Sequence, residues 1–452
     1  MRKIKTVDLA VIIVSVLFIL VIGAIFNLYN INISLLILVF FFAYYIKGLR
    51  RKPEPDYLSL CFLFVLGLVC LIVSKNMGLE WYAAPIIALA ILINVLYMDI
   101  EFSFSYLTLI CILGSAILDY NFKIFLIYMV SGSTAIFLSV NVRKRFDIIK
   151  AGALAGFMQF LMAVGLMSFA EISSLRQSLG LSLFNGIISS SLIIAFLLWF
   201  FERLLGVITN ISLLELSDFN HPLLRRMILE APGTYQHSLV VANLAEAAAE
   251  SIGANSLLVR VGAYYHDIGK ISKSEYFSEN QMLSGYKDKH KNLTPAMSKL
   301  IIMNHVKEGV ELARKHHFNR KIIDFIGQHH GTTLVYYFFR RAQETKSEDT
   351  NSDDVYRYPG PRPGSKEVAL VHLADTIEAR SRVLDEATPA RIKEMVKEAI
   401  LNKFLDGQLD ASELTLRDLE KVAEVFTRLL NAMFHTRVDY PKPLEDEAQN
   451  NH

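Results

Sequence analysis

Apolar residues fill most of the first 205 positions, in long runs that short polar turns separate. A helix that crosses the apolar core of a bilayer needs roughly 20 such residues, within a range of about 17–25. By that measure we expect a polytopic α-helical membrane domain over residues 1–205. Its eight spans are predicted at about residues 7–28, 31–47, 57–75, 81–98, 102–119, 122–141, 148–170 and 182–205.

The turns between these runs give the expected orientation. Lysine and arginine cluster at residues 1–5, 48–52 and 143–145, and such clusters favour the cytoplasmic side of a membrane. Eight spans then return the chain to the cytoplasm before residue 206. The first run is too long, and lacks the small-residue cleavage pattern, to be a removed signal peptide.

The interior of the predicted spans is almost free of ionisable residues. A transporter places such residues at membrane depth along its ion or proton path, so a transport function is disfavoured. Gly152, Gly156 and Gly165 are interpreted as positions of close helix packing rather than as part of a ligand pocket.

After residue 205 the pattern becomes amphipathic and polar. Residues 206–225 predict a connector with one apolar face, residues 226–440 an all-α soluble domain, and residues 441–452 a tail. The apolar face of the connector comprises Leu213, Leu214, Leu216 and Phe219. Capping and stop signals predict helices from Thr234 to Ile252 before Gly253, over about 255–267 with Gly269 as breaker, from Pro295 after Thr294, over 321–330 before Gly331, and over 366–384.

Charge and cysteine content narrow the function classes. A formal net charge of +2 is too small to argue for binding of a nucleic-acid polymer. The three cysteines, Cys61, Cys70 and Cys111, all lie in apolar runs. Neither a disulfide framework nor a cysteine-based zinc site is therefore expected.

Histidines and carboxylates in the soluble half predict a metal centre. All twelve histidines follow residue 220, and several stand in predicted helices beside an aspartate. Histidine with carboxylate suits Mn²⁺ or Fe²⁺ and also accepts Zn²⁺ or Ni²⁺. We expect two divalent ions that share the carboxylate of Asp267. The first ion would take His237, His266, Asp267 and Asp375, and the second Asp267, His305 and His329, with His330 as a further candidate.

Two ions about 3.5–4 Å apart can share a hydroxide and stabilise the displacement of a phosphoester. Lys270 lies one helical turn after His266, and its ammonium is a candidate for neutralising a phosphate oxygen. The group that protonates the leaving oxygen is not identifiable from these residues. Six histidines are interpreted as surface or loop residues: His221, His290, His316, His317, His435 and His452. His372 lies one turn before Asp375 and could contact a metal ligand without binding the metal itself. That interpretation is less favoured than one in which His372 has no role at the metal centre.

With these residues identified, the chain resembles the HD superfamily of metal phosphohydrolases. It is most similar to the bacterial seven-transmembrane HD family that hydrolyses cyclic di-AMP. The similarity is carried by residues 230–238, 263–270, 276–281, 328–332, 358–361, 414–418 and 434–437. The resemblance implies metal ligands at His237, His266, Asp267, His305, His329 and Asp375, a ligand or phosphate contact at His330, and the linear product pApA. Related enzymes that cut cyclic di-GMP carry a Gly-Tyr-Pro signature after the His-Asp element, which this sequence lacks.

The resemblance also has implications for the membrane location, for contacts with the nucleotide and for an extracytoplasmic domain. Members of the family usually carry a large extracytoplasmic domain after the first membrane helix, whereas only about residues 27–32 separate the first two predicted spans. We expect a multi-pass protein of the bacterial cell membrane, with its HD domain in the cytoplasm and homo-oligomerisation left open. Tyr336 and Tyr337 are candidates for stacking on an adenine, although core packing is favoured for two of the four aromatic residues 336–339. The acidic segment 343–354 predicts a mobile loop near the site.

Two alternatives to this enzyme stay open. A non-catalytic membrane receptor or scaffold would bind a nucleotide in its HD domain without cutting it. An HD hydrolase of cyclic di-GMP or of another nucleotide would use the same ligands on a different substrate.

Overall fold

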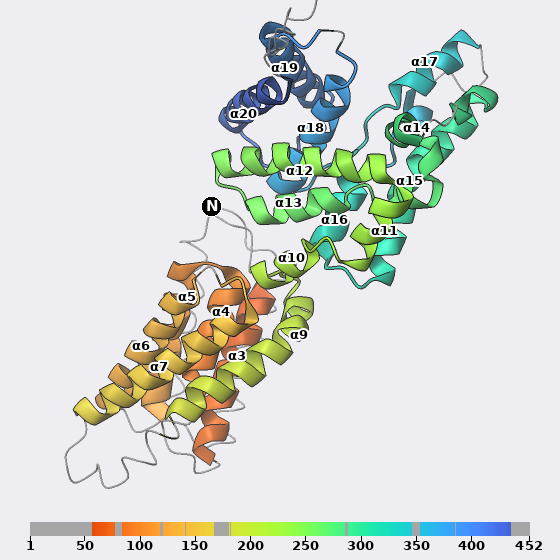
Figure 1. Ribbon diagram of the computed structural model, residues 1–452. Helices are drawn as coiled ribbons and strands as arrows, with labels where there is room; N and C mark the ends of the chain where they lie inside the picture. Colours follow the sequence, from red (N-terminus) through yellow and green to blue (C-terminus); the bar gives the residue numbers. More distant parts are fainter. Residues whose placement is uncertain are drawn as a thin grey trace, which may run out of the picture. The chain divides into compact units, whose positions relative to one another are not determined.

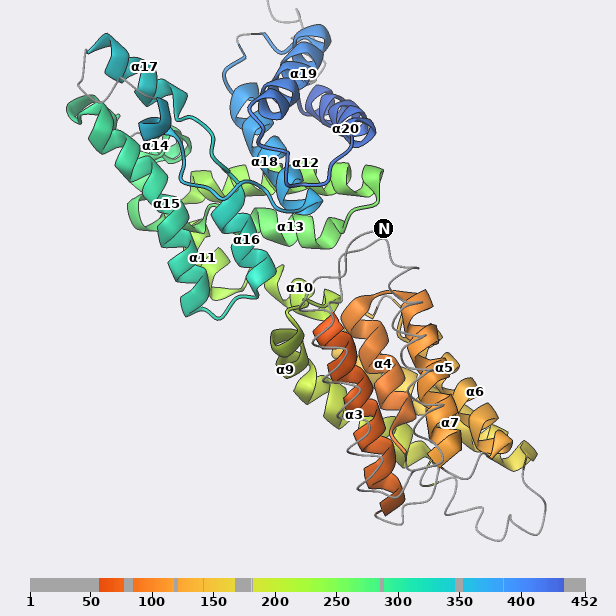
Figure 2. The same ribbon diagram turned by 180° about the vertical axis from the view of Figure 1, so that it is seen from behind.

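The computed structural model describes residues 57–76, 84–117, 121–140, 142–166, 180, 182–284, 288–345, 353–384 and 386–434. The predicted spans 7–28 and 31–47, the tail 441–452, His435 and His452 lie outside these residues. The chain divides into two compact units, with the boundary between Glu215 and Leu216. Helices make up the regular structure of both, beside an isolated bridge between Leu334 and Arg357 (Figures 1 and 2). The expected all-α fold is confirmed.

The first unit is a bundle of apolar helices in which α4 and α6 each pack against several neighbours (Figure 1). Its elements are α3 (Tyr57–Asn76), α4 (Ile86–Tyr97), α5 (Ile100–Ile117), α6 (Phe122–Leu138), α7 (Arg145–Leu166), the π-helix η3 (Asn185–Ile194), α9 (Ala195–Leu205) and α10 (Asn210–Leu216). They follow the predicted runs 57–75, 102–119 and 122–141 closely, and the helix described in the run 81–98 is α4. Within the described residues, Ile100–Ile117 and Arg145–Leu166 are long and apolar enough to cross a membrane.

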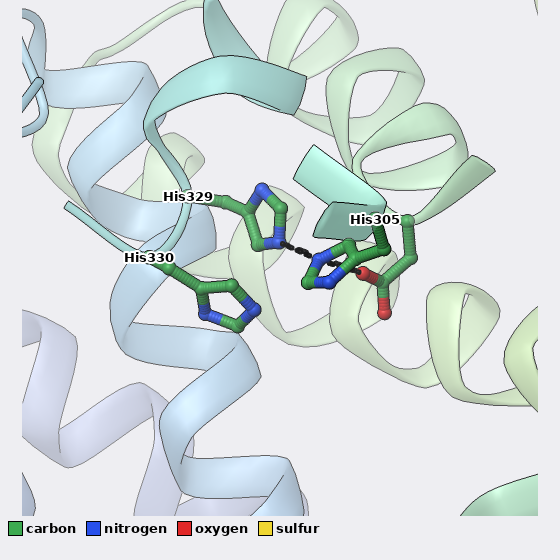
Figure 3. A group of neighbouring side chains, drawn as sticks. His305, His329 and His330 are labelled. Atoms are coloured by element: carbon green, nitrogen blue, oxygen red, sulfur yellow. Dashed lines mark hydrogen bonds and ion pairs between the residues drawn. The ribbon is translucent and has the colours of Figure 1, made fainter. Parts of the chain in front are cut away.

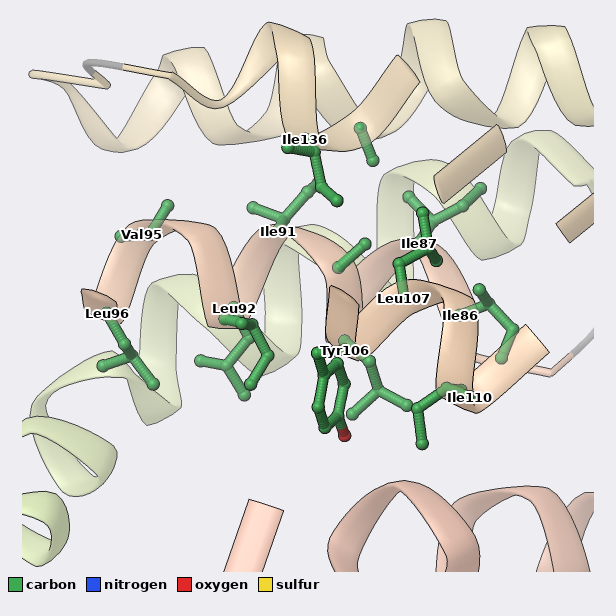
Figure 4. Packing of buried hydrophobic residues seen from close by; sticks show 14 of the residues in the cluster. Ile86, Ile87, Ile91, Leu92, Val95, Leu96, Tyr106, Leu107, Ile110 and Ile136 are labelled. Atoms are coloured by element: carbon green, nitrogen blue, oxygen red, sulfur yellow. The ribbon is translucent and has the colours of Figure 1, made fainter. Parts of the chain in front are cut away.

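The interior of this bundle is mostly aliphatic. Ile87, Ile91 and Leu92 of α4 are buried together with Leu107 and Ile110 of α5 (Figure 4). Small residues bring α7 and η3 together, because a Cβ at Gly152 would lie 2.1 Å from the carbonyl oxygen of Gly186. Gly156 is likewise crowded, whereas a Cβ at Gly165 would meet none of the described residues within 4 Å, so the packing role of Gly165 stays a prediction.

The predicted connector is two short helices rather than one amphipathic segment. The buried carboxylate of Glu202 accepts a hydrogen bond from the backbone N–H of Thr209 at 2.7 Å and another from the Ser212 hydroxyl at 2.7 Å. These bonds satisfy donors at the start of α10. Leu213, assigned to the apolar face of the connector, is fully buried, whereas Phe219 of the same predicted face is exposed.

The second unit is built around α12 (Pro232–Ile252), which packs against α13 (Ser256–Tyr265), α18 (Lys366–Ser381) and α20 (Leu416–Phe434). A second group of contacts joins α15 (Pro295–Lys315) to the 3₁₀ helix η4 (Ile268–Tyr276), α16 (Arg320–Gln328) and α17 (Tyr336–Glu344). Figure 2 shows α16 between α13 and α15. The remaining elements are α11 (Pro222–Glu230), α14 (Ser278–Ser284), η5 (Lys289–Asn292), η7 (Asp353–Tyr356) and α19 (Pro389–Leu405).

Most of the helix boundaries in this unit agree with the sequence signals. Thr294 caps α15 through its side chain, and Gly253 and Gly331 adopt the left-handed conformation where helices end. Thr234, in contrast, is not the cap of α12. That helix begins at Pro232, and the amide oxygen of Asn280 accepts hydrogen bonds from the backbone N–H groups of Gly233 and Thr234 at 2.8 and 3.1 Å.

Gly269 has a different role from the predicted one. The chain continues past it as η4, so it is not a breaker. A Cβ at this position would lie 1.8 Å from the carbonyl oxygen of His305. Glycine therefore permits the close approach of η4 to α15, which brings the segment after Asp267 against the helix that carries His305.

Candidate metal centre

The seven predicted ligands come from five helices or their ends and meet in the interior of the second unit. His237 lies in the second turn of α12 and Asp375 in α18. His266 ends α13, so Asp267 follows where the chain leaves helical geometry. His305 lies midway along α15, and His329 ends α16 with His330 beside it.

Asp267 lies at the centre of the group. Its Oδ2 is 3.4 Å from Nε2 of His266 and 3.6 Å from Nε2 of His237. Its Oδ1 is 3.3 Å from Nε2 of His305 and 3.5 Å from Nε2 of His329. The ligand atoms therefore form two sets that could each hold an ion, His237–His266–Asp267 and Asp267–His305–His329–His330, with the carboxylate of Asp267 in both.

The orientation of the imidazoles fits a cation. His266, His305 and His329 place Nδ1 2.7, 2.5 and 2.9 Å from the carbonyl oxygens of Ala263, Ile302 and Ile326. A carbonyl only accepts, so Nδ1 carries the proton and Nε2 exposes a lone pair to the centre. The Nε2 atoms of His305 and His329 are only 3.3 Å apart, as the dashed line in Figure 3 marks. Two lone pairs at this distance repel unless a proton or a metal cation lies between them.

Unsatisfied polar atoms support the same conclusion. Nε2 of His266 and Oδ1 of Asp267 are buried and have no hydrogen-bond partner among the described residues. A buried acceptor without a partner costs about 1–3 kcal/mol. Two such atoms in one cluster are explained when they bind an ion, so the residues present fit a divalent metal centre.

Asp375 contacts both sets of ligands. One of its oxygens is 3.1 Å from Nε2 of His237, and the other is 3.5 Å from Nδ1 of His330. The ring of His330 stacks on Tyr358, with centroids 4.3 Å apart. The assignment of Asp375 to the first ion alone stays a prediction, and His330 lies where it can bind the second.

The electrostatics keep most of these groups ready to bind a cation. Burial would raise the pKa of Asp267, but Lys270 and His266 hold it well below its usual value. Burial lowers the pKa of His329, as it does that of His330. For His237, burial is opposed by the carboxylates of Asp375 and Glu378, which raise its pKa to about 10. At neutral pH an ion must therefore displace a proton from His237, whereas His329 and His330 are already neutral.

Lys270 is part of the centre through Asp267. Its Nζ lies 2.6 Å from Oδ2 of Asp267 and 2.9 Å from Oε1 of Glu279. Burial would lower the pKa of Lys270, but these two carboxylates raise it, so it stays charged. The ammonium of Lys270, which we predicted to neutralise a phosphate oxygen, thus already forms ion pairs with two carboxylates.

The other histidines divide into two classes. His316 and His317 are exposed, as predicted, and His221 begins α11. His290, predicted to be exposed or in a loop, is buried in η5, where Nε2 lies 2.9 Å from the carbonyl oxygen of Tyr276. His372 contacts a residue of the metal centre, which was the less favoured of its two interpretations. It is buried, its Nδ1 lies 2.5 Å from the carbonyl oxygen of His329, and burial lowers its pKa to about 3.

The aromatic run 336–339 is split between surface and core. Tyr336 and Tyr337 are 63% and 65% exposed, whereas Phe338 is buried with Tyr356 and Phe339 packs against the same small core. The preference for core packing at two of the four residues is therefore confirmed. The stacking of Tyr336 or Tyr337 on an adenine stays a prediction.

The sequence did not single out three residues that contact the centre. Glu378 accepts a hydrogen bond from Nδ1 of His237 at 2.7 Å, Glu279 pairs with Lys270, and Tyr358 stacks on His330. Glu378 follows Asp375 by three residues, which places both on one face of α18. That spacing is the signal by which it could have been found.

Comparisons with known proteins agree with this description. A family model described as "7TM receptor with intracellular HD hydrolase" matches residues 25–209, and the HD domain model matches residues 234–380. The HD match contains all the ligand candidates.

Two curated relatives match most of the chain. It is 35% identical to cyclic-di-AMP phosphodiesterase PgpH of Bacillus subtilis (strain 168), over 90% of this chain and 58% of that protein. It is also 35% identical to the protein of the same name from Listeria monocytogenes, over 84% of this chain and 53% of that protein. The chain thus spans little more than half the length of these relatives.

One solved structure is the HD domain of the L. monocytogenes phosphodiesterase PgpH in complex with cyclic-di-AMP. It is 44% identical to this chain, covers 49% of it and is itself fully covered, with a TM-score of 0.46. By its two family matches and its curated relatives, the chain is similar to 7TM receptors with an intracellular HD hydrolase.

Proposed function

We propose that this chain is a membrane-bound, metal-dependent phosphodiesterase that hydrolyses cyclic di-AMP to pApA. The observation that carries the proposal is the carboxylate of Asp267, whose two oxygens each face a pair of buried histidines. Two relatives that align with most of the chain are named cyclic-di-AMP phosphodiesterases, which favours this substrate over cyclic di-GMP.

The reaction consumes one water for each bond cut. The water oxygen adds to one phosphorus, the bond from that phosphorus to the 3′ oxygen breaks, and the product carries a 5′ phosphate and a free 3′ hydroxyl. Divalent ions in the two sets of ligands would lower the pKa of a water and offset charge on the phosphodiester. Mn²⁺ and Fe²⁺ suit the ligands best.

The residues of the chain have separate tasks in this proposal. Asp267 holds the two positions together, and the backbone carbonyls behind His266, His305 and His329 fix the ring orientations. Lys270 keeps Asp267 ionised and contributes a positive charge close to the phosphate. Tyr336 or Tyr337 would stack on an adenine.

The membrane location also belongs to the proposal. The first family model is that of a 7TM receptor, and the described part of the first unit contains two helices long enough to span a bilayer. We place this unit in the bacterial cell membrane and the HD domain in the cytoplasm, in accord with the basic residues at 48–52 and 143–145. Homo-oligomerisation stays open.

The test is product analysis with the full chain in detergent micelles. Cyclic di-AMP and Mn²⁺ are expected to give pApA, and equal amounts of cyclic di-GMP should compete poorly. A receptor or scaffold would bind cyclic di-AMP and form no pApA with Mn²⁺, Fe²⁺, Zn²⁺ or Ni²⁺. That result would reject the enzyme, and preferential cleavage of cyclic di-GMP would reject the substrate.

A further inference from the structure

The imidazole of His237 differs from those of His266, His305 and His329 in the partner of its Nδ1. The other three rings donate to neutral backbone carbonyls, whereas Nδ1 of His237 lies 2.7 Å from the carboxylate Oε2 of Glu378. The residues are 141 positions apart in the sequence and both are buried. This asymmetry distinguishes the two sets of ligands.

A carboxylate acceptor changes the donor strength of the ring. It attracts the Nδ1 proton more strongly than a carbonyl does, so electron density at Nε2 rises, and the ring binds a cation more tightly once its Nε2 proton has been displaced. Nε2 of His237 also faces Asp375 at 3.1 Å. Asp375 also contacts His330 of the other set, so Glu378 is the anion that distinguishes the set of His237.

Arg382 holds Glu378 in the orientation that this contact requires. Its Nε donates to Oε1 of Glu378 at 2.6 Å, and its Nη2 contacts the same oxygen. Oε2 is thereby left for His237. The guanidinium also compensates the buried carboxylate, because an unpaired charge in this position would be strongly destabilising.

We propose that Glu378 is a positioning residue that makes the His237–His266–Asp267 set the tighter of the two cation positions. The Asp267–His305–His329–His330 set is then the position that exchanges its ion more readily. This inference rests on the proposed metal centre and adds an order of affinity to it.

The test is a Mn²⁺ titration of the metal-free full chain in detergent, with bound and free metal measured at equilibrium. The wild-type protein should bind two ions with different affinities. Glu378→Gln keeps an acceptor of the same size but removes the charge, and should weaken the tighter position by about 10- to 100-fold. The affinity of the weaker position for Mn²⁺ should change by less than about threefold, which is small beside the effect on the tighter position. Glu378→Asp, which keeps the charge, should recover part of the loss.

A matched control separates this role from a merely structural one. Glu398 lies on the neighbouring helix α19, is exposed, and pairs with Arg380 at 3.6 Å. Glu398→Gln should bind both ions as the wild type does, and metal-free Glu378→Gln should melt within a few degrees of it. Equal weakening of both positions in Glu378→Gln, or none, would overturn the inference while leaving the proposed function intact. A wild-type protein that binds no divalent ion would overturn both.

Discussion

The ammonium of Lys270 lies 2.6 Å from Oδ2 of Asp267, while Oδ1 of the same carboxylate faces His305 and His329. The buried carboxylate of Asp267 thus forms an ion pair with Lys270 and also belongs to both sets of candidate ligands. Lys270 is held in turn by Glu279 and by the ring of Phe277, 5.0 Å from its Nζ. A change at Asp267 is therefore expected to affect both metal positions, and a change at Lys270 the charge balance around them.

Asp267→Ala should lose both ions and abolish hydrolysis, because the two oxygens of Asp267 each face one pair of the histidines. His305→Ala should empty mainly the second position and leave the first partly filled. Metal content measured beside turnover checks both outcomes. Asp410→Asn, which changes an exposed carboxylate, is the control. Two ions and measurable turnover in Asp267→Ala would show that the shared carboxylate is misassigned.

Lys270→Met should keep both ions and lose most of the activity. The methionine fills similar space, but removing the positive charge that we propose acts on the phosphate is expected to lower kcat by roughly 10²–10³-fold, as for other groups that stabilise transition-state charge. Metal content and kcat are measured on the same preparation. Lys273→Met, at a more exposed lysine on the same 3₁₀ helix, should retain activity. Unchanged kcat in Lys270→Met would exclude a role for its charge in the reaction.

Gly269→Ala should destabilise the second unit and displace His305. The added Cβ would lie 1.8 Å from the carbonyl oxygen of His305, so η4 and α15 must separate at a cost of about 1–3 kcal/mol or more. Thermal melting with and without Mn²⁺ measures the loss. Gly327→Ala is the matched control, because its Cβ meets only a side-chain carbon of Val310 at an ordinary 3.6 Å. A Gly269→Ala protein as stable as Gly327→Ala would mean that the two helices are not packed this closely.

The sequence predicted the candidate metal ligands better than the residues that hydrogen-bond to them. His237, His266, Asp267 and the other candidates carry recognisable chemistry at helical positions, so their convergence could be expected. The partners of these residues depend on tertiary structure. Glu378 reaches His237 across 141 positions, and Asn280, rather than Thr234, satisfies the start of α12 from 46 positions away. His290 was misjudged for the same reason, because Tyr276 and Phe338 cover its ring only in the folded chain.

Lys403 predicts a pH-dependent stability. Burial lowers its pKa to about 8 from an ordinary 10.5, although Asp375 and Asp406 oppose the shift. Between these pH values the folded chain binds fewer protons than the unfolded chain, so Lys403 makes the free energy of unfolding rise with pH. Below about pH 8 the lysine is charged in both states, and the full cost of burying its charge lowers the stability of the folded chain. Lys403→Met should therefore melt above the wild type at pH 7, with a gap that narrows towards pH 10.

Melting curves of both proteins at the two pH values isolate this contribution. Lys397→Met, at an exposed lysine of the same helix, should show no such gap. A Lys403→Met protein that melts below the wild type at pH 7, or a gap that does not change with pH, would show that the lysine is not penalised by burial.

The central claim is that hydrolysis requires two ions that share Asp267. It is tested most directly by adding Mn²⁺ stepwise to the metal-free full chain while bound metal and pApA formation are measured together. We predict little turnover of cyclic di-AMP with one ion per chain and full turnover as the second binds. Full turnover with a single ion per chain, or none with two, would contradict the account.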